Sequence, residues 1–452
     1  MMRTSCTQFC LFFLLIIFSF QLNGQQKKKP NILLITADDL GLQVGAYGDT
    51  IARTPNIDKL AREGVRFTNG YVTQASCSSS RSSILTGLYP HQNGQLGLSH
   101  MGFSMYDSIL TLPQILHQQG YKTGIIGKLH VEPVDKFPFD FEYAKNNSSL
   151  TRNVRAVANK AANFIKETEE SPFFLMVNYL DPHFKFIPQV EGLPKNPYNA
   201  NEIEPFPFQL IDTEAQKRRI ANFYSCIARL DDGIGMLMEE LVATGKAENT
   251  LIIFVGDHGA PFNRGKTSCY EAGVKIPYII QLLKEMSTSK EVDALVSTVD
   301  IMPTILEVAN IEVEHTIEGK SLLPIIDGDE DEWRTHLYSE FFYHGPKTYY
   351  PRYAVRNNRY KLIYNVKDTI NPILSIDSDN SYKFSQEGRF DGTLARQIFN
   401  RFANPPKFEL YDLYEDPNEL YNLSDDEEKV KILSELKSNL QQWMIKTNAS
   451  QS

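Results

Sequence analysis

Residues 31–39 read Asn-Ile-Leu-Leu-Ile-Thr-Ala-Asp-Asp, an apolar run that ends in two adjacent acids. A short run of this kind, without polar alternation, is typical of a strand buried on both faces of a sheet. It therefore predicts a parallel strand whose carboxyl end carries two carboxylates.

Segments typical of strands and helices alternate after this run. A helix is predicted from Pro55 to Glu63, with Thr54 at its cap and Gly64 as its stop. Two further helices are predicted over 110–119 and 213–243, and three further strands over 122–126, 172–180 and 250–255. Such alternation predicts an α/β fold with a largely parallel sheet, in which ligands bind beyond the carboxyl ends of the strands.

From about residue 335 the sequence becomes rich in Tyr and Phe, and 336–343, 353–356 and 360–364 indicate short antiparallel strands. Residues 424–427 predict a capping box for a final helix. Its apolar face would carry Val430, Leu433, Leu436, Leu440 and Trp443. We expect a catalytic α/β domain over 25–335 and a smaller C-terminal subdomain, an antiparallel sheet plus the terminal helix, over 336–452.

The N-terminus of this 452-residue chain has the pattern of an export signal. Arg3 precedes an apolar stretch over 10–20, and Gly24-Gln25 offers a cleavage point, so 1–24 is predicted to be a signal peptide. An uncleaved membrane anchor is the alternative, but no later stretch is long enough to span a membrane. We expect an exported protein, periplasmic or secreted. The cysteines that remain, Cys77, Cys226 and Cys269, are too few for a disulfide framework.

The formal net charge of −9 argues against nucleic-acid binding. An anionic substrate would be repelled by the molecule as a whole. Attraction would have to come from a local cluster of cationic side chains.

Residues 77–87 read Cys-Ser-Ser-Ser-Arg-Ser-Ser-Ile-Leu-Thr-Gly and place Cys77 and Arg81 four residues apart. They lead into a predicted helix, whose N-terminus attracts anions. Taken alone, such a motif is more often a buried cysteine in a serine-rich turn, so the other motifs decide its meaning.

Acidic pairs follow two of the predicted strands. Asp38-Asp39 and Asp257-His258 would be costly to bury without a partner, and a hard divalent cation would offset that cost. Alternatively, these acids cap helices or turns.

Candidate catalytic cations and histidines also follow strands. Lys128 and His130, His183, and Lys266 on a glycine-containing loop could hold a tetrahedral oxyanion and protonate a leaving group. Each taken singly is more often a structural histidine or a solvated lysine. His100 is close enough to the Cys77 motif in sequence to be a substrate contact.

Together these segments resemble the formylglycine-dependent sulfatase family over about residues 30–445. The resemblance rests on 31–39, 54–61, 77–87, 124–130, 181–183 and 256–259, followed by 298–304 and 409–417. Through 89–94, 123–130 and 137–141 the chain is most similar to the heparan N-sulfatase branch, which also includes bacterial sulfatases acting on polysaccharides such as ulvan.

The resemblance implies an alkaline-phosphatase-like fold, a mostly parallel sheet sandwiched by helices, and one calcium ion. The implied calcium ligands are Asp38, Asp39, Asp257 and His258, with Cys77 facing the metal after a maturase has converted it to formylglycine. Arg81 would orient the aldehyde hydrate. The side chains that would bind sulfate oxygens or transfer protons are Lys128, His130, His183 and Lys266. The chain departs from the family twice: Ser79 stands where proline or alanine is usual, and His258 where asparagine is common.

The sequence thus predicts a sulfatase acting on a sulfated polysaccharide, with the O-sulfate of an algal polysaccharide such as ulvan favoured. N-sulfoglucosamine hydrolysis on heparan-type chains is the closest alternative. A phosphoester hydrolase could use the same arrangement of metal and nucleophile. A non-catalytic sugar-binding protein would result if Cys77 stayed unconverted.

Overall fold

The computed structural model describes residues 28–286, 288–312, 316–329, 331, 333–367 and 369–449. The predicted signal peptide lies outside these residues. Within the described part of the chain, no helix combines the length and the apolar composition needed to cross a membrane.

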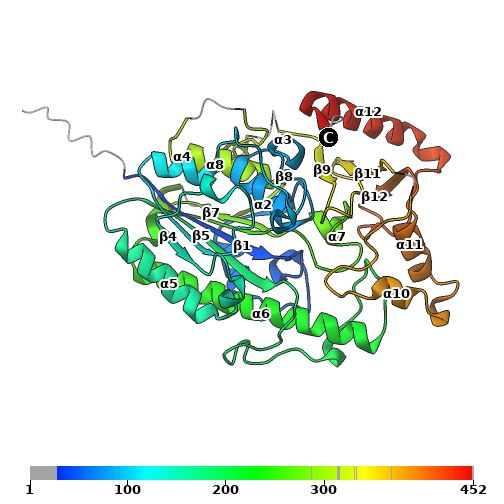
Figure 1. Cartoon of the computed structure of the whole chain (residues 1–452), viewed down its shortest axis with the longest axis horizontal. Helices are drawn as coiled ribbons and strands as arrows, with labels where there is room; N and C mark the ends of the chain where they lie inside the picture. The colour runs from blue at the N-terminus through cyan, green and yellow to red at the C-terminus, as the bar shows by residue number, and fades with distance from the viewer. Residues whose placement is uncertain are drawn as a thin grey trace, which may run out of the picture.

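An eight-stranded sheet forms the centre of the larger part of the molecule, in the order β4-β3-β5-β1-β6-β7-β2-β8 (Figure 1). Every neighbouring pair is parallel except those that involve β7. The strands are β1 (Asn31–Asp38), β2 (Val65–Tyr71), β3 (Lys122–Gly127), β4 (Phe141–Tyr143), β5 (Phe173–Pro182), β6 (Thr250–Gly256), β7 (Tyr278–Gln281) and β8 (Lys290–Ser297). The predicted mostly parallel α/β sheet is confirmed.

Helices cover both faces of this sheet, as Figure 1 shows. On one face, α1 (Pro55–Glu63), α5 (Val154–Glu167) and α6 (Glu214–Ala243) bury their apolar sides. On the other lie α2 (Cys77–Thr86), α4 (Leu112–Gln118), α8 (Ile301–Val308) and α9 (Leu323–Asp327). Two short helices, α3 (Pro90–Asn93) and α7 (Glu271–Val274), complete this part of the chain.

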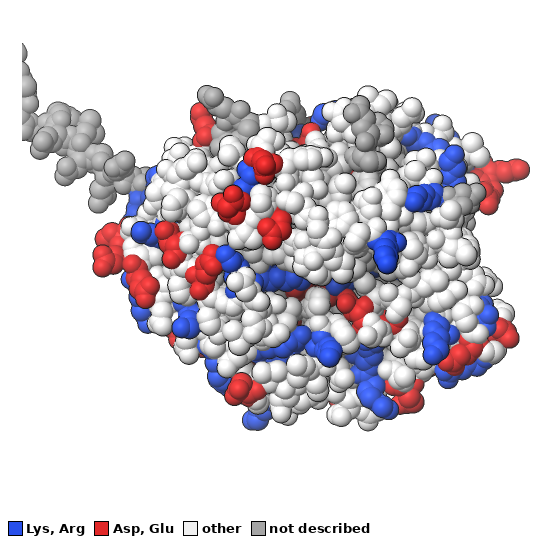
Figure 2. Space-filling model, viewed as in Figure 1, with Lys and Arg blue, Asp and Glu red and all other residues white. Residues whose placement is uncertain are grey.

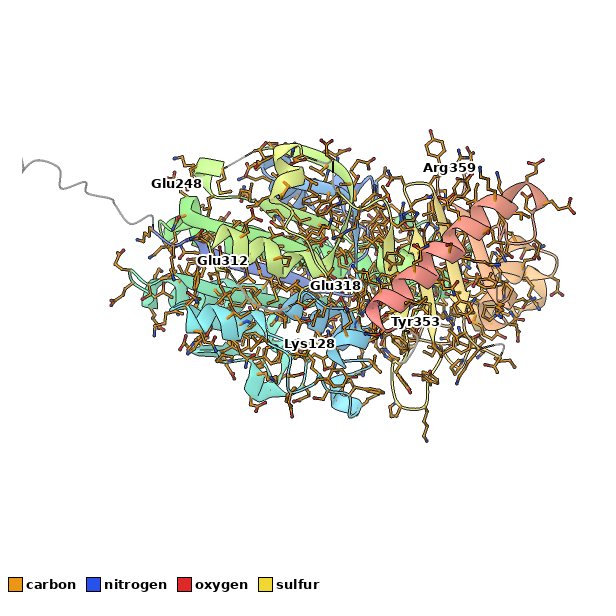
Figure 3. All side chains as sticks on the ribbon, turned by 90° about the horizontal axis from the view of Figure 1, so that it is seen from above. Lys128, Glu248, Glu312, Glu318, Tyr353 and Arg359 are labelled. Atoms are coloured by element: carbon orange, nitrogen blue, oxygen red, sulfur yellow. The ribbon has the colours of Figure 1, made fainter. Side chains whose placement is uncertain are left out.

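A separate antiparallel sheet follows, in the order β12-β11-β10-β9. It comprises β9 (Leu337–Phe341), β10 (Arg352–Arg356), β11 (Tyr360–Asn365) and β12 (Phe408–Asp412), with α10 (Ser381–Ser385) and α11 (Leu394–Ala403) beside it. The last helix, α12 (Val430–Thr447), packs on this sheet, and the Tyr353 hydroxyl donates to Ala449 O at 2.7 Å near the helix end (Figure 3). The predicted antiparallel sheet with a terminal helix is therefore present.

Two predicted helix caps are wrong in detail. The Ser424 hydroxyl accepts a hydrogen bond from Asn422, and Asp426 instead caps the short 3-10 turn that leads into α12. Val430 is consequently exposed at the start of that helix. At α1, Asp231 of α6 accepts the first free backbone N–H groups, at 2.8 Å from Ile57 N.

The carboxyl ends of β3, β5, β1 and β6 meet at one edge of the sheet. In the strand register, Asp38 pairs with Pro182, Ala37 with Gly256 and Gly127 with Asn178. Every acidic or basic motif that the sequence placed after these strands therefore starts from the same edge.

A buried ion pair fixes the loop after β5. Both Asp181 oxygens accept from Arg229 of α6, at 2.7 and 2.9 Å, and Arg152 bonds to the same carboxylate. Arg152 also donates to His183 O at 2.8 Å. Asp181 thus ties the segment that carries His183 to two helical regions of the large domain.

We predict that Asp181→Ala lowers the free energy of unfolding by about 3–5 kcal/mol, because it leaves two buried guanidinium groups without their carboxylate. The midpoint of urea unfolding measures this loss. Glu142→Ala, which removes a surface partner of Lys145, is the matched control and should leave the midpoint nearly unchanged. An equal midpoint for both variants would contradict the structural role of Asp181.

Candidate active site

The predicted site residues meet at the edge where the four strands end. Asp38 and Asp39 end β1, Lys128 follows β3, and Asp257 follows β6. The face in Figure 2 is hollowed across its middle, close to where β1 ends in the same view of Figure 1, and Lys and Arg side chains line part of this hollow. Figure 3 places Lys128 midway along the molecule.

The carboxylates of Asp38, Asp39 and Asp257 form the floor of the site, and all three residues are fully buried. Asp39 has a φ of 70°, a left-handed conformation that is uncommon for a non-glycine residue. Its backbone N–H donates to Asp257 Oδ1 at 2.8 Å. This turn brings the carboxylates of neighbouring strands β1 and β6 together.

Cys77 is the first residue of α2 and is 2% exposed. Its Sγ lies 3.4 Å from His258 Nε2. Every residue of α2 is buried, and the small serine side chains allow this close enclosure. The hydroxyls of Ser82 and Ser83 each donate a hydrogen bond to Ser79 O within the helix.

Arg81, one turn into α2, joins the helix to the strand ends. Its Nε donates to Asp257 Oδ2 at 3.0 Å, and one terminal nitrogen donates to Lys128 O at 3.1 Å and to Thr36 Oγ1 at 3.3 Å. These three bonds hold the guanidinium rigidly one helical turn from Cys77.

Two lysines form ion pairs with the buried carboxylates at the end of β1. Lys128 Nζ lies 2.7 Å from Asp38 Oδ2. Lys266 Nζ lies 3.0 and 3.1 Å from the two Asp39 oxygens. Each lysine therefore stands beside one of the acids at the end of β1.

Lys266 has a second partner that the sequence patterns did not indicate. Its Nζ lies 2.8 Å from Asp377 Oδ2, on the segment between β11 and α10. The neighbouring Asp379 anchors this segment, because its buried carboxylate accepts from Asn263 N at 2.8 Å and from Gln209 and Gln216 of the large domain. No motif or periodicity distinguishes Asp377 in the sequence.

The histidines fall into two groups. His183 Nε2 lies 3.8 Å from Asp39 Oδ2, and His258 Nε2 lies 3.0 Å from Asp39 Oδ1. His130 is paired with His100, whose Nδ1 lies 2.7 Å from His130 Nε2. His344, another residue that sequence reasoning missed, lies 3.4 Å from the Ser76 hydroxyl beside Cys77.

Charge shapes the protonation of these groups. Burial alone would raise the pKa of the Asp38 carboxyl, but Lys128, His183 and Arg81 hold that pKa well below its usual range. Burial opposes ionisation of Lys266, yet Asp39 raises the pKa of this lysine well above its ordinary value. Asp257 differs, because burial and the charge of Asp38 raise its pKa.

The residues present fit a hard divalent cation. One ligand atom from each of Asp38, Cys77, Asp257 and His258 lies within 4.8 Å of the others, and Asp38, Asp39, Cys77 and His183 form a second such group. Asp38 Oδ1 is buried and has no hydrogen-bond partner within the described part of the chain. His258 Nδ1 lies 3.0 Å from Gly259 O, a bond that leaves Nε2 as the ring atom available to a metal.

A bound cation would also change the net charge of the lysine, arginine and aspartate side chains that surround the site. Among lysine, arginine and aspartate side chains, three cations (Arg81, Lys128 and Lys266) face four acids (Asp38, Asp39, Asp257 and Asp377). A bound divalent ion would turn this excess of one negative charge into an excess of one positive charge. The site could then attract an anion such as a sulfate group.

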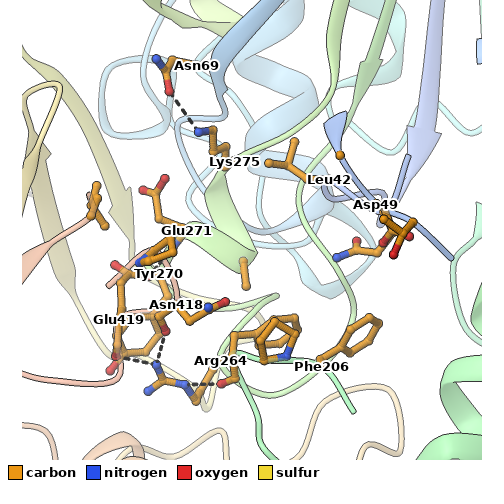
Figure 4. A pocket seen from close by; sticks show the side chains of 18 of the residues that line it. Leu42, Asp49, Asn69, Phe206, Arg264, Tyr270, Glu271, Lys275, Asn418 and Glu419 are labelled. Carbon is orange, nitrogen blue, oxygen red and sulfur yellow. Dashed lines mark hydrogen bonds between the residues drawn. The ribbon is translucent and has the colours of Figure 1, made fainter. Parts of the chain in front are cut away.

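A separate cavity of about 590 Å³ is lined by residues from both the part of the chain that forms the large sheet and the part that forms the small one (Figure 4). Its lining includes Phe206, Arg264, Glu271 and Lys275, and Lys275 donates to Asn69 at 3.0 Å. None of the eleven residues predicted for the site lines it.

Comparisons with known proteins show which family this chain resembles. Residues 30–311 match the family model described as Sulfatase, and residues 256–380 match the model of the C-terminal part of N-sulphoglucosamine sulphohydrolase. The human N-sulphoglucosamine sulphohydrolase is 32% identical, over 94% of this chain and 92% of its own length. An ulvan-active sulfatase of Formosa agariphila is 27% identical, over 92% and 80%. A solved 2-O GAG sulfatase has a TM-score of 0.72 at 23% identity, covering 93% of both chains.

We predict that calcium raises the melting temperature of the wild-type protein, by the equivalent of about 2.7 kcal/mol at a hundredfold excess over its dissociation constant. Asp38→Asn should abolish this shift, because it removes the charge of the carboxylate with the unpartnered oxygen. Thermal unfolding with calcium and with EDTA measures both. Asp293→Asn, which alters an acid beside Thr68 and Asn69 on the far strands of the sheet, is the control and should retain the shift. A full shift in the Asp38 variant would contradict the site.

Proposed function

The chain belongs to the sulfatase family, and from that premise we propose that it removes the N-sulfate group from glucosamine residues of heparan-type chains. The coarser statement, an enzyme that acts on sulfated glycosaminoglycan-like carbohydrate, follows from the family and its relatives. The more specific proposal of N-desulfation rests on the residues that the C-terminal part of the chain contributes at or beside the site.

The supporting observation is the match of residues 256–380 to the C-terminal model of N-sulphoglucosamine sulphohydrolase. This stretch contains Lys266, His344 and Asp377, which lie at or beside the cluster. Contacts from the C-terminal subdomain are the ones a sugar would meet, because the floor of the site is taken up by the carboxylates that would hold the ion and by the lysines that would hold the sulfate.

We propose that a maturase converts Cys77 to formylglycine and that one calcium ion is bound by Asp38, Asp39, Asp257 and His258. When both are present, the aldehyde hydrate supplies the nucleophile and the ion supplies positive charge beside it. The other site residues then bind the anion, orient the reacting groups and move protons.

Arg81 orients the residue at position 77, since it lies one helical turn away and is fixed by bonds to Asp257 and to Lys128 O. Lys128 and Lys266 bind sulfate oxygens with their ammonium groups, each held in place by one acid. Charge fixed in advance in this way stabilises the transition state, because nothing has to reorganise as the reaction proceeds.

His183 is the proposed proton donor to the leaving nitrogen. Its Nδ1–H donates to Phe184 O, so in the protonated ring the hydrogen on Nε2, which is directed at Asp39, is the one that can be passed on. His130, which follows β3 next to β5, is the proposed base, and the exposed His100 beside it could also contact the sugar. Proton transfers by positioned histidines contribute typically ~10²–10⁴-fold to rate.

A second candidate is O-desulfation of an algal polysaccharide such as ulvan. The sequence alone favours it. Two ulvan-active sulfatases also support it, since each matches 92% of this chain. We place it second because these relatives are 27% and 26% identical, against 32% for the human N-sulfatase. The match to the sulfatase model argues against the phosphoester alternative.

We further propose that the protein is exported after removal of residues 1–24, to the periplasm or beyond the cell. The export machinery, the maturase and a sulfated carbohydrate are then its expected partners. A sugar-binding protein without catalysis remains the alternative if Cys77 is not converted, and Ser79 in the motif is the feature that favours it.

Coexpression with a formylglycine-generating enzyme should replace the sulfur of Cys77 by oxygen, and the mass of the tryptic peptide measures this. Cys77→Ser should lower kcat by at least ~10³-fold with an unchanged melting temperature, because a serine cannot form the hydrate. Cys226→Ser, at a buried thiol on α6, is the matched control and should keep its activity. An unmodified thiol in an inactive wild-type protein would favour the binding protein.

Assayed by sulfate release, glucosamine N-sulfate should be hydrolysed with a kcat/KM at least tenfold above that of glucosamine 6-O-sulfate or ulvan oligosaccharides, equivalent to about 1.4 kcal/mol. Greater activity on ulvan oligosaccharides would reverse the order of the two candidates. Greater activity on a phosphate monoester would overturn both.

A further inference from the structure

Lys266 lies between a buried acid and a partly exposed one. Its Nζ is 3.0 and 3.1 Å from the two oxygens of Asp39 and 2.8 Å from Asp377 Oδ2. The side chains of Asp39 and Lys266 are 0% and 1% exposed, whereas that of Asp377 is 18% exposed. An ammonium group has three hydrogens to donate, and these three contacts can use all of them. In this arrangement Lys266 has no hydrogen left for a sulfate oxygen.

Lys266 and the proposed calcium ion would use the same oxygens of Asp39. His258 Nε2 lies 3.0 Å from Asp39 Oδ1, and Lys266 contacts both oxygens. The ion would need at least one of these oxygens, because carboxylate oxygens are ligands that calcium prefers. Two cations that share one carboxylate also repel each other. Binding of the ion at Asp39 therefore requires that Lys266 give up part of its contact with that carboxylate.

The backbone around Asp377 is fixed by contacts with the large domain. Asp377 O accepts a hydrogen bond from Arg219 of α6 at 2.6 Å. Asp377 and Ser378 have φ values of 49° and 63°, left-handed conformations that persist in residues with side chains only where the surrounding structure enforces them. Buried Asp379 accepts from Asn263 N at 2.8 Å, on the loop that also carries the ammonium group. These contacts hold the Asp377 carboxylate in place beside that group.

Partial exposure allows Asp377 to stay charged at a lower cost than the acids on the floor of the site. Asp38, Asp39 and Asp257 are fully buried, and a buried carboxylate needs a cationic partner to remain ionised. The carboxylate of Asp377 keeps some contact with water. It can therefore serve as the acid partner of Lys266 whether or not Asp39 remains one.

We propose that Asp377 is a positioning residue that acts through Lys266, because it holds the ammonium group when Asp39 binds the ion. Without Asp377, Lys266 would pair with Asp39 alone and would compete with the ion for that carboxylate. With Asp377, the ammonium group keeps an acid partner, and the hydrogens that leave Asp39 become available to a sulfate oxygen. This role of Asp377 rests on the calcium ligands of the proposed function.

Calorimetric titration of the protein with calcium tests this role without any substrate. Asp377→Asn should raise the calcium dissociation constant about tenfold, whereas Asp377→Glu, which keeps the charge, should stay within about threefold of the wild type. Asp391→Asn, at an exposed acid paired with Arg396, is the matched control and should bind calcium as the wild type does. A residue that only ties two parts of the chain together would lower the melting temperature in EDTA and leave the calcium affinity unchanged, and that result would overturn the role.

A double-mutant cycle separates an effect that passes through Lys266 from the simple loss of a negative charge near the ion. Lys266→Met should tighten calcium binding, because it removes the competing ammonium group. In that background, Asp377→Asn should change the calcium dissociation constant by less than about threefold. Equal losses of affinity in the two backgrounds would show that Asp377 acts only through its charge, and would overturn the positioning role.

The same titrations distinguish failure of this role from failure of the proposed function. Calcium binding that depends on Asp38 but not on Asp377 would overturn the role of Asp377 alone. Calcium binding that depends on both acids, in a matured enzyme that releases no sulfate from any sulfated sugar, would overturn the proposed function alone. A wild-type protein that binds no calcium would overturn both.

Discussion

The structure depends on three carboxylates that are completely buried at the ends of two adjacent strands. Asp38, Asp39 and Asp257 cannot remain charged in such a place without compensation, since an isolated buried charge is very unfavourable. Arg81, Lys128 and Lys266 provide that compensation, and each comes from a different segment of the chain. The position of α2, of the loop after β3 and of the glycine-containing loop after β6 therefore follows from one electrostatic requirement.

The same requirement explains why the smaller sheet belongs to the site. Lys266 faces Asp39 on one side and Asp377 on the other, so the charge on one lysine links the large domain with the segment between β11 and α10. Asp379 fastens that segment to Asn263, three residues before Lys266. These contacts consequently hold the C-terminal part of the chain against the cluster of candidate site residues.

Much of this arrangement could be predicted from local sequence, and the rest shows where local sequence stops. The run over 31–36 is strongly apolar and bounded by acids, so its strand and the site at its end were predictable. Asp377 was not, because its partner Lys266 is distant in sequence. The cap of α12 was mispredicted for a related reason: Ser424 fits the pattern, but Asn422 already uses its hydroxyl. Local patterns identify what a residue can do, and tertiary contacts decide what it does.

The complete enclosure of α2 has a consequence for the order of events in the cell. Cys77 is 2% exposed and every residue of its helix is buried, so a modifying enzyme cannot reach the thiol in the folded protein. The proposed conversion of Cys77 would therefore have to precede folding, while the segment is still extended. Under that proposal, the window for modification closes when α2 packs against the sheet, and a chain that folds unmodified is left without the proposed nucleophile.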